Sequence, residues 1–154
     1  LKRRVVSGLN TMEVVTQKHH SAICKLIEDH SNHPPIFLNY HKPDKPQDIE
    51  PTENEFWLLK KLNSDVAAII HVRKSNDGMG EFEIIVAPEF RSKGIASEFL
   101  SELIEYCNNK TSWNGLKAGV KKGNTASEKL LIKKGFNCVH KSHLGSDWKI
   151  EFNR

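Results

Sequence analysis

The residues with the clearest chemical potential lie in one short stretch, Val86-Ala87-Pro88-Glu89-Phe90-Arg91-Ser92-Lys93-Gly94-Ile95-Ala96. This stretch joins an expected strand to an expected helix. The first backbone N–H groups of a helix have no acceptor within the helix, and with the positive end of the helix dipole they form an anion site. Gly94 leaves room for a phosphate to approach the backbone, Ala96 keeps the next turn small, and Arg91 and Lys93 add positive charge. The stretch therefore predicts a pyrophosphate-binding loop.

The residues around this loop narrow its interpretation, because a glycine between a strand and a helix often only turns the chain. Arg-x-x-Gly-x-Ala after Val-x-Pro-x-x resembles motif A of the GNAT N-acetyltransferase superfamily, [Gln/Arg]-x-x-Gly-x-[Gly/Ala]. A second match follows. The expected strand Leu116–Lys121, then Asn124, Leu130 and Lys133-Lys134-Gly135-Phe136, resembles the family's Asn-x-x-Ala-x-x-Leu-Tyr-x-x-x-Gly-Phe segment. The resemblance covers about Phe56 to Phe152.

The resemblance implies both a fold and a reaction. The fold is a mixed α/β domain with a central, mostly antiparallel sheet of six to seven strands and helices on both faces. The reaction moves an acetyl group from acetyl-CoA directly to a primary amine of a small molecule or peptide, with both reactants bound at once. A non-catalytic module that binds or senses acyl-CoA is the alternative.

The resemblance also implies cofactor-binding positions. Val86 would lie on a splayed strand whose backbone pairs with the pantetheine arm, and the amides beside it would polarise the thioester carbonyl. Asn124 matches a residue beside the pantetheine. The positions that match the pyrophosphate loop are Arg91, Ser92, Lys93, Gly94, Ile95 and Ala96.

Two departures from the family pattern leave the catalytic residues open. Leu131 stands where the family often has the tyrosine that protonates the departing thiolate, and the family's strand glutamate aligns with Gly80 or Phe82. Glu83 could accept the proton of the amine, or could only pair with a basic side chain of the hairpin. His71 could do the same work near neutral pH, or could be a structural, hydrogen-bonded histidine.

Hydrophobic periodicity predicts the elements that position these residues. The helices carry apolar residues at helical spacing, and two of the strands are apolar on both parities, as strands covered on both faces are. The expected helices are Gln17–His30, Ile95–Asn109 and Thr125–Lys134. The expected strands are Met12–Thr16, Phe56–Leu62, Val66–Lys74, Gly80–Val86, Leu116–Lys121, Phe136–Lys141 and Asp147–Phe152.

A proline-rich segment, residues 31–54, separates the first helix from the second strand. Prolines at this density exclude a regular helix, and a loop of this length is often functional. Tyr40 and His41 in this segment are candidate substrate-pocket residues, with simple anchoring of the loop as the alternative. Histidines gather near this segment without the spacing of a zinc site, so we expect no metal.

Length, net charge and composition bear on the number of domains, the class of ligand and the cellular compartment. A chain of 154 residues fits one domain, placed at residues 12–154, and residues 1–11 are either an extension outside the fold or part of it. A net charge of +4 suits an anionic nucleotide, but it is too diffuse to indicate nucleic acid. Three widely spaced cysteines and the lack of a long apolar window favour a reduced, cytoplasmic protein without a membrane segment. Dimers are common in the family, which leaves room for a homodimer.

Overall fold

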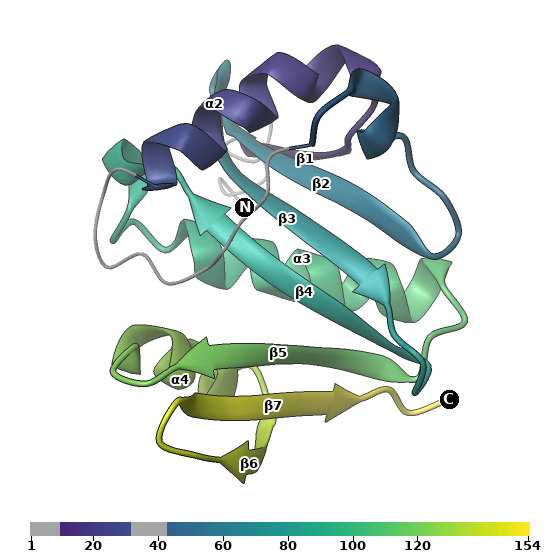
Figure 1. Ribbon diagram of the computed structural model, residues 1–154, viewed down its shortest axis with the longest axis vertical. Coiled ribbons are helices and arrows are strands. Elements are labelled where there is room, and N and C mark those ends of the chain that lie inside the picture. Colours follow the sequence, from purple (N-terminus) through teal and green to yellow (C-terminus); the bar gives the residue numbers. More distant parts are fainter. Residues whose placement is uncertain (1–9, 32–42) are drawn as a thin grey trace, which may run out of the picture. The chain divides into compact units, whose positions relative to one another are not determined.

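The computed structural model describes residues 10–31 and 43–154 (Figure 1). Its helices are α2 (His20–Ser31), α3 (Ile95–Lys110) and α4 (Thr125–Lys133), with short 3-10 helices η1 (Gln17–His19), η2 (Pro46–Ile49) and η3 (Pro88–Phe90). Its strands are β1 (Asn10–Val14), β2 (Glu55–Leu62), β3 (Asp65–Lys74), β4 (Met79–Val86), β5 (Gly115–Lys121), β6 (Asn137–Lys141) and β7 (Gly145–Glu151). No helix in these ranges is both long and apolar enough to cross a membrane.

The strands form one seven-stranded sheet in the order β1-β2-β3-β4-β5-β7-β6. Most neighbours are antiparallel, as in β1–β2, β5–β7 and β6–β7, whereas β4 and β5 are parallel. A parallel pair requires a crossover connection, and α3 lies in the segment between these two strands. The expected mixed α/β fold is confirmed, with seven strands.

The described chain falls into two compact units. The first unit lies within Leu1–His71 and Ile84–Phe99, and the second comprises Val72–Glu83 and Leu100–Arg154. The strands β3 and β4 and the helix α3 each contribute to both units. The prediction of a single domain over residues 12–154 therefore stays a prediction.

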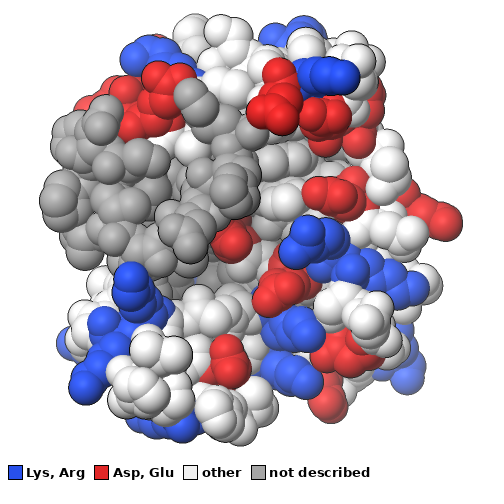
Figure 2. Space-filling view, in the orientation of Figure 1, with Lys and Arg blue, Asp and Glu red and all other residues white. Residues whose placement is uncertain are grey.

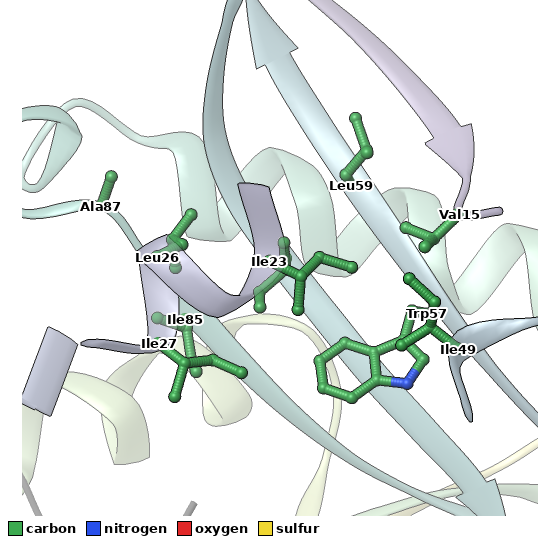
Figure 3. Packing of buried hydrophobic residues seen from close by; sticks show 10 residues of the cluster. Val15, Ile23, Leu26, Ile27, Ile49, Trp57, Leu59, Ile85 and Ala87 are labelled. Carbon is green, nitrogen blue, oxygen red and sulfur yellow. The ribbon is translucent and has the colours of Figure 1, made fainter. Parts of the chain in front are cut away.

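In the first unit, α2 packs against one face of the sheet (Figures 1 and 3). Helical spacing brings Ile23 and Ile27 to the side that faces the strands, and strand alternation brings Trp57 and Leu59 to the side that faces the helix. The cluster is completed by Val15, Leu26, Ile49, Ile69, Ile85 and Ala87. Each large apolar side chain buried here contributes about 1.5–3 kcal/mol before the entropy cost of folding is subtracted.

In the second unit, β7 pairs with both β5 and β6, and these three strands lie side by side in Figure 1. Close backbone packing forces small residues here. A Cβ at Gly115 would lie 2.1 Å from the carbonyl oxygen of Ile150, and a Cβ at Gly80 would lie 2.5 Å from the Trp113 ring. The glycines of this unit therefore allow strands and rings to approach each other.

The element boundaries differ from the sequence prediction in two places. β1 begins at Asn10, which pairs with Leu62, so residues 10 and 11 belong to the sheet and not to an extension; residues 1–9 lie outside the described residues. The first helix opens as the 3-10 turn η1, because the ring nitrogen Nδ1 of His19 accepts the Thr16 N–H at 3.0 Å and caps that turn. The other predicted elements are confirmed to within one or two residues.

Candidate functional site

The predicted loop follows β4 in the first unit and leads through η3 into α3. The carbonyl oxygen of Gly94 accepts the Glu98 N–H at 3.1 Å, so Gly94 is the N-cap residue directly before α3. Ser92 and Gly94 have φ angles of 63° and 79°, in the left-handed region. Left-handed residues in a tight turn can direct neighbouring N–H groups toward one side, the geometry of anion-binding nests. The backbone of this loop is thus compatible with the predicted anion site.

Gly94 faces open space. A Cβ built on Gly94 meets no atom within 4 Å, and the residues from Ser92 to Gly94 are exposed. The next residue, Ile95, is 6% exposed and anchors the start of the helix in the core. Packing within the protein therefore does not require a small residue at position 94; the left-handed φ of 79° favours glycine there, and the space beside it is open.

Arg91 turns back toward the end of β4. Its Nε donates to the carbonyl oxygen of Val86 at 3.3 Å, which holds the guanidinium beside the strand end. The Ala87 N–H donates to Ala67 on β3 at 2.8 Å, so the strand end is also fixed to its neighbour. The first unit thus brings together Val86 and the loop from Arg91 to Ala96, and it keeps their backbone geometry defined.

Asn124 has a clear local role. It lies in the second unit at the start of α4, where its side-chain oxygen accepts the Ser127 N–H at 3.2 Å. An asparagine in this position satisfies one of the N–H groups that the helix cannot. Its predicted contact with the pantetheine stays a prediction.

His71 belongs to a group that sequence reasoning missed. Its Nε2 lies 2.6 Å from the Glu55 Oε2, and its ring stacks on Trp57 with centroids 4.3 Å apart and planes at 17°. When the imidazole is neutral, Nε2–H donates to the carboxylate and Nδ1 keeps a lone pair, which is the form that can accept a proton. The predicted strands Phe56–Leu62 and Val66–Lys74 leave three residues for the turn between them. Counting back from Leu62 opposite Val66 places Trp57 opposite His71, with Glu55 two positions further along the same face, so this group could have been found from the sequence.

Glu83 lies on β4 in the second unit and is half-buried. Burial raises the pKa of its carboxyl group above the usual 4.5, and the negative charge of Glu81 raises it further. The positive charge of Arg73 opposes this shift. A carboxylate with a raised pKa is a better proton acceptor at neutral pH than an ordinary one.

The two departures from the family pattern fall at buried positions. Leu131 on α4 is 4% exposed, so the position of the frequent tyrosine holds a packed hydrocarbon. Gly80 lies against Trp113, and the Phe82 ring packs on Phe136 with centroids 5.8 Å apart. These two positions serve packing in this chain. Tyr40 and His41 lie outside the described residues, and their proposed role stays a prediction.

Figure 2 shows both basic and acidic side chains among the described residues in view. Within residues 10–31 and 43–154, no three His, Cys, Asp or Glu side chains are grouped so that they could hold a metal ion. The free thiol of Cys107 is buried, and burial raises its pKa to about 12, so it is unsuited to nucleophilic chemistry.

The chain was compared with known proteins. A family model described as an acetyltransferase (GNAT) domain matches residues 38–137, which is more than half of the chain. No curated protein matches significantly. Similar solved structures include a GNAT-family acetyltransferase from Streptococcus pneumoniae, with 15% identity, a TM-score of 0.79 and coverage of 94% of this chain and 99% of that one.

Two further structures share the fold. One is a putative acetyltransferase from Salmonella typhimurium with its cofactor acetyl-CoA, at 16% identity, a TM-score of 0.75 and coverage of 94% and 95%. The other is an N-acetyltransferase from Staphylococcus aureus, at 20% identity, a TM-score of 0.75 and coverage of 92% and 98%. The match to the family model over residues 38–137 therefore establishes that this chain belongs to the GNAT family of acetyltransferases.

Proposed function

We propose that the protein transfers the acetyl group of acetyl-CoA to a primary amine of a small molecule or peptide, directly and within a ternary complex. The observation that carries this proposal is the loop from Arg91 to Ala96, where Gly94 faces open space at the start of α3. The Salmonella structure of the same fold, which contains acetyl-CoA, supports the choice of co-substrate.

The proposed binding mode uses the backbone of the first unit. The pyrophosphate is held by N–H groups at the start of α3, together with the positive charges of Arg91 and Lys93. The pantetheine arm pairs with the backbone at Val86. The Val86 carbonyl oxygen already accepts from Arg91 and the Ala87 N–H is bonded to Ala67, so the Val86 N–H pairs with the pantetheine and another amide beside it polarises the thioester carbonyl.

The chemical step needs little covalent help from the protein. The neutral amine attacks the thioester carbonyl, a C–N bond forms, the C–S bond breaks, and coenzyme A leaves as a thiolate that takes up a proton. Holding both reactants in line is worth up to ~7–11 kcal/mol. The protein must then remove one proton from the incoming ammonium and stabilise charge on the carbonyl oxygen.

Two side chains are candidates for the proton acceptor. The ring of His71 is held by Glu55 and Trp57, and Glu83 has a raised pKa. Kinetics of His71→Gln, Glu55→Gln and Glu83→Gln separate the two. Loss of rate in His71→Gln and, to a smaller extent, in Glu55→Gln assigns the role to His71, because Glu55 acts only through it. Loss in Glu83→Gln alone assigns the role to Glu83.

The alternative function is a module that binds acyl-CoA without catalysis. The buried Leu131, at the position of the frequent tyrosine, is the observation that favours it. The magnitudes favour the enzyme, because leaving as an unprotonated thiolate near neutral pH costs roughly 2 kcal/mol for a thiol pKa of about 8.5. That penalty is small beside the contribution of positioning.

A panel of amines and peptides tests the proposal, with release of free thiol as the readout. Acceptor-dependent release by the wild type supports the enzyme, and Leu131→Tyr should release thiol faster where departure limits the rate. Binding of acetyl-CoA without release by either protein would support the module instead. We also propose that the protein is cytoplasmic and that it forms a homodimer. Light scattering at several protein concentrations tests the homodimer.

A further inference from the structure

A lysine is buried in the first unit. Lys60 on β2 is 1% exposed, and its Nζ lies 2.8 Å from the Glu98 Oε1. Lysine is almost never fully buried unless it is paired, because removing its charge from water costs several kcal/mol. Strand alternation places Lys60 on the face of β2 opposite to Leu59, which packs in the α2 cluster. The buried amine therefore belongs to the other face of the strand, where α3 begins.

Glu98 lies within the first turn of α3. Its N–H donates to Gly94, the residue that faces open space in the proposed pyrophosphate loop. A carboxylate near a helix N-terminus interacts favourably with the helix dipole, but its negative charge also repels an anion bound at the same terminus. Glu98 would therefore weaken binding of a pyrophosphate unless its charge is compensated.

We propose that Lys60 is a positioning residue for coenzyme A: it neutralises the negative charge of Glu98 in the first turn of α3. The inference rests on the proposed function, since it concerns the same loop. Lys60 does not touch the ligand. By compensating the charge of Glu98 it leaves the positive end of the helix available to the anion.

The adjacent lysine provides a matched control. Lys61 also lies on β2 and also forms an ion pair, with Glu13 on β1 at 3.2 Å. Its side chain is 32% exposed and points to the opposite face of the strand. Lys61→Met thus removes the same charge from the same strand, but away from the start of α3.

The test compares Lys60→Met, Glu98→Gln, the double variant and Lys61→Met. For each, melting temperature and the dissociation constant for coenzyme A are measured, together with the KM for S-acetylpantetheine, which lacks the pyrophosphate. Lys60→Met should lose about tenfold in affinity for coenzyme A, or 1.4 kcal/mol, with the KM for S-acetylpantetheine unchanged. Glu98→Gln should lower the melting temperature but keep or increase the affinity. The double variant should recover most of the affinity for coenzyme A that Lys60→Met loses.

A purely structural pair gives a different pattern, in which Lys60→Met and Glu98→Gln lose affinity in parallel with stability. That pattern, or an affinity of Lys60→Met equal to that of Lys61→Met, would overturn the inference. If Lys60→Met does not fold, Glu98→Gln alone still tests the inference. Only charge compensation predicts that Glu98→Gln keeps its affinity for coenzyme A while its melting temperature falls. Failure of the wild type to bind coenzyme A would instead overturn the proposed function.

Discussion

Two glycines, one in each unit, are small for opposite reasons. Gly115 in the second unit has no room for a side chain, since a Cβ would lie 2.1 Å from a backbone oxygen of β7. Gly94 in the first unit has nothing within 4 Å of its Cβ position. Packing requires the first glycine, whereas the second is favoured by a left-handed φ of 79° and has open space beside it. The comparison teaches that two motif glycines can be small for different reasons, and that only the one with open space beside it leaves room for the proposed phosphate.

The largest effect is expected at Gly115. Gly115→Val would drive methyl groups into Ile150 and Glu151 of β7 and separate β5 from its neighbour. We expect a loss of about 3 kcal/mol or more in the free energy of unfolding, or failure to fold. Urea denaturation measures it. A urea midpoint of Gly115→Val within error of the wild type would show that β7 can move aside and that packing does not require a glycine at this position.

Gly94→Val should produce the opposite result. The protein should fold, with a cost of ~1–2 kcal/mol for a β-branched residue at a φ of 79°, and acetyl-CoA binding should be lost. Gly135→Val is the matched control, because Gly135 is also left-handed and its Cβ position has only an ordinary contact at 3.6 Å. Calorimetric titration of both variants decides. Equal affinity of Gly94→Val and Gly135→Val for acetyl-CoA would show that the pyrophosphate does not bind at Gly94.

The pH dependence of catalysis sharpens the role of Glu83. A base works only when it is deprotonated, so a raised pKa moves the acid limb of the kcat/KM profile to higher pH than an ordinary carboxyl group would give. Where Glu83 is the base, Glu83→Gln should lower the rate about 10²-fold. Glu81→Gln is the control. It should keep the plateau value of kcat/KM and shift the acid limb of the profile to lower pH, because the charge of Glu81 helps to raise the pKa of Glu83. A limb unchanged in Glu83→Gln would exclude this carboxylate.

The smallest effect is expected at Asp77, in the turn between β3 and β4. A hydrogen bond from Ser75, the Met79 N–H and the Lys117 amine lower the pKa of this carboxyl group from its usual 3.8. The stability it contributes is present above pH 3.8 and is lost as the pH falls through the depressed pKa. Asp77→Asn should therefore be slightly less stable than the wild type at pH 7, with a smaller difference at pH 2 and unchanged acetyl-CoA affinity. A difference that grows on acidification would contradict this assignment.

The sequence predicts most of the fold because its signals are local. Periodicity and turn residues define β2 to β7, and they require no knowledge of which strand lies beside which. The loop at Gly94 was predictable for the same reason, since residues near in sequence make both the turn and the helix start. The predicted start of β1, Met12, lies two residues after the observed start at Asn10. Asn10 and Thr11 pair with a distant strand, and a local pattern does not show such pairing.

The parts of the site that the sequence did not predict depend on pairing across distance. His71 gains its partner Glu55 from a neighbouring strand, and neither residue alone indicates a dyad. Lys60 reads as an ordinary charged residue until its burial and its contact with Glu98 are seen. The environment that raises the pKa of Glu83 is likewise tertiary. Burial and partners decide what a titratable side chain can do, and a linear pattern contains neither.

Binding of acetyl-CoA to the wild-type protein tests the central claim most directly. The protein is heated with and without millimolar acetyl-CoA, and a calorimetric titration gives the dissociation constant. A ligand at a hundred times its dissociation constant should stabilise the native state by ~2.7 kcal/mol, and Gly94→Val should remove that stabilisation. Absence of both a thermal shift and a binding isotherm for the wild type would contradict the assignment of the Arg91–Ala96 loop as the acetyl-CoA site.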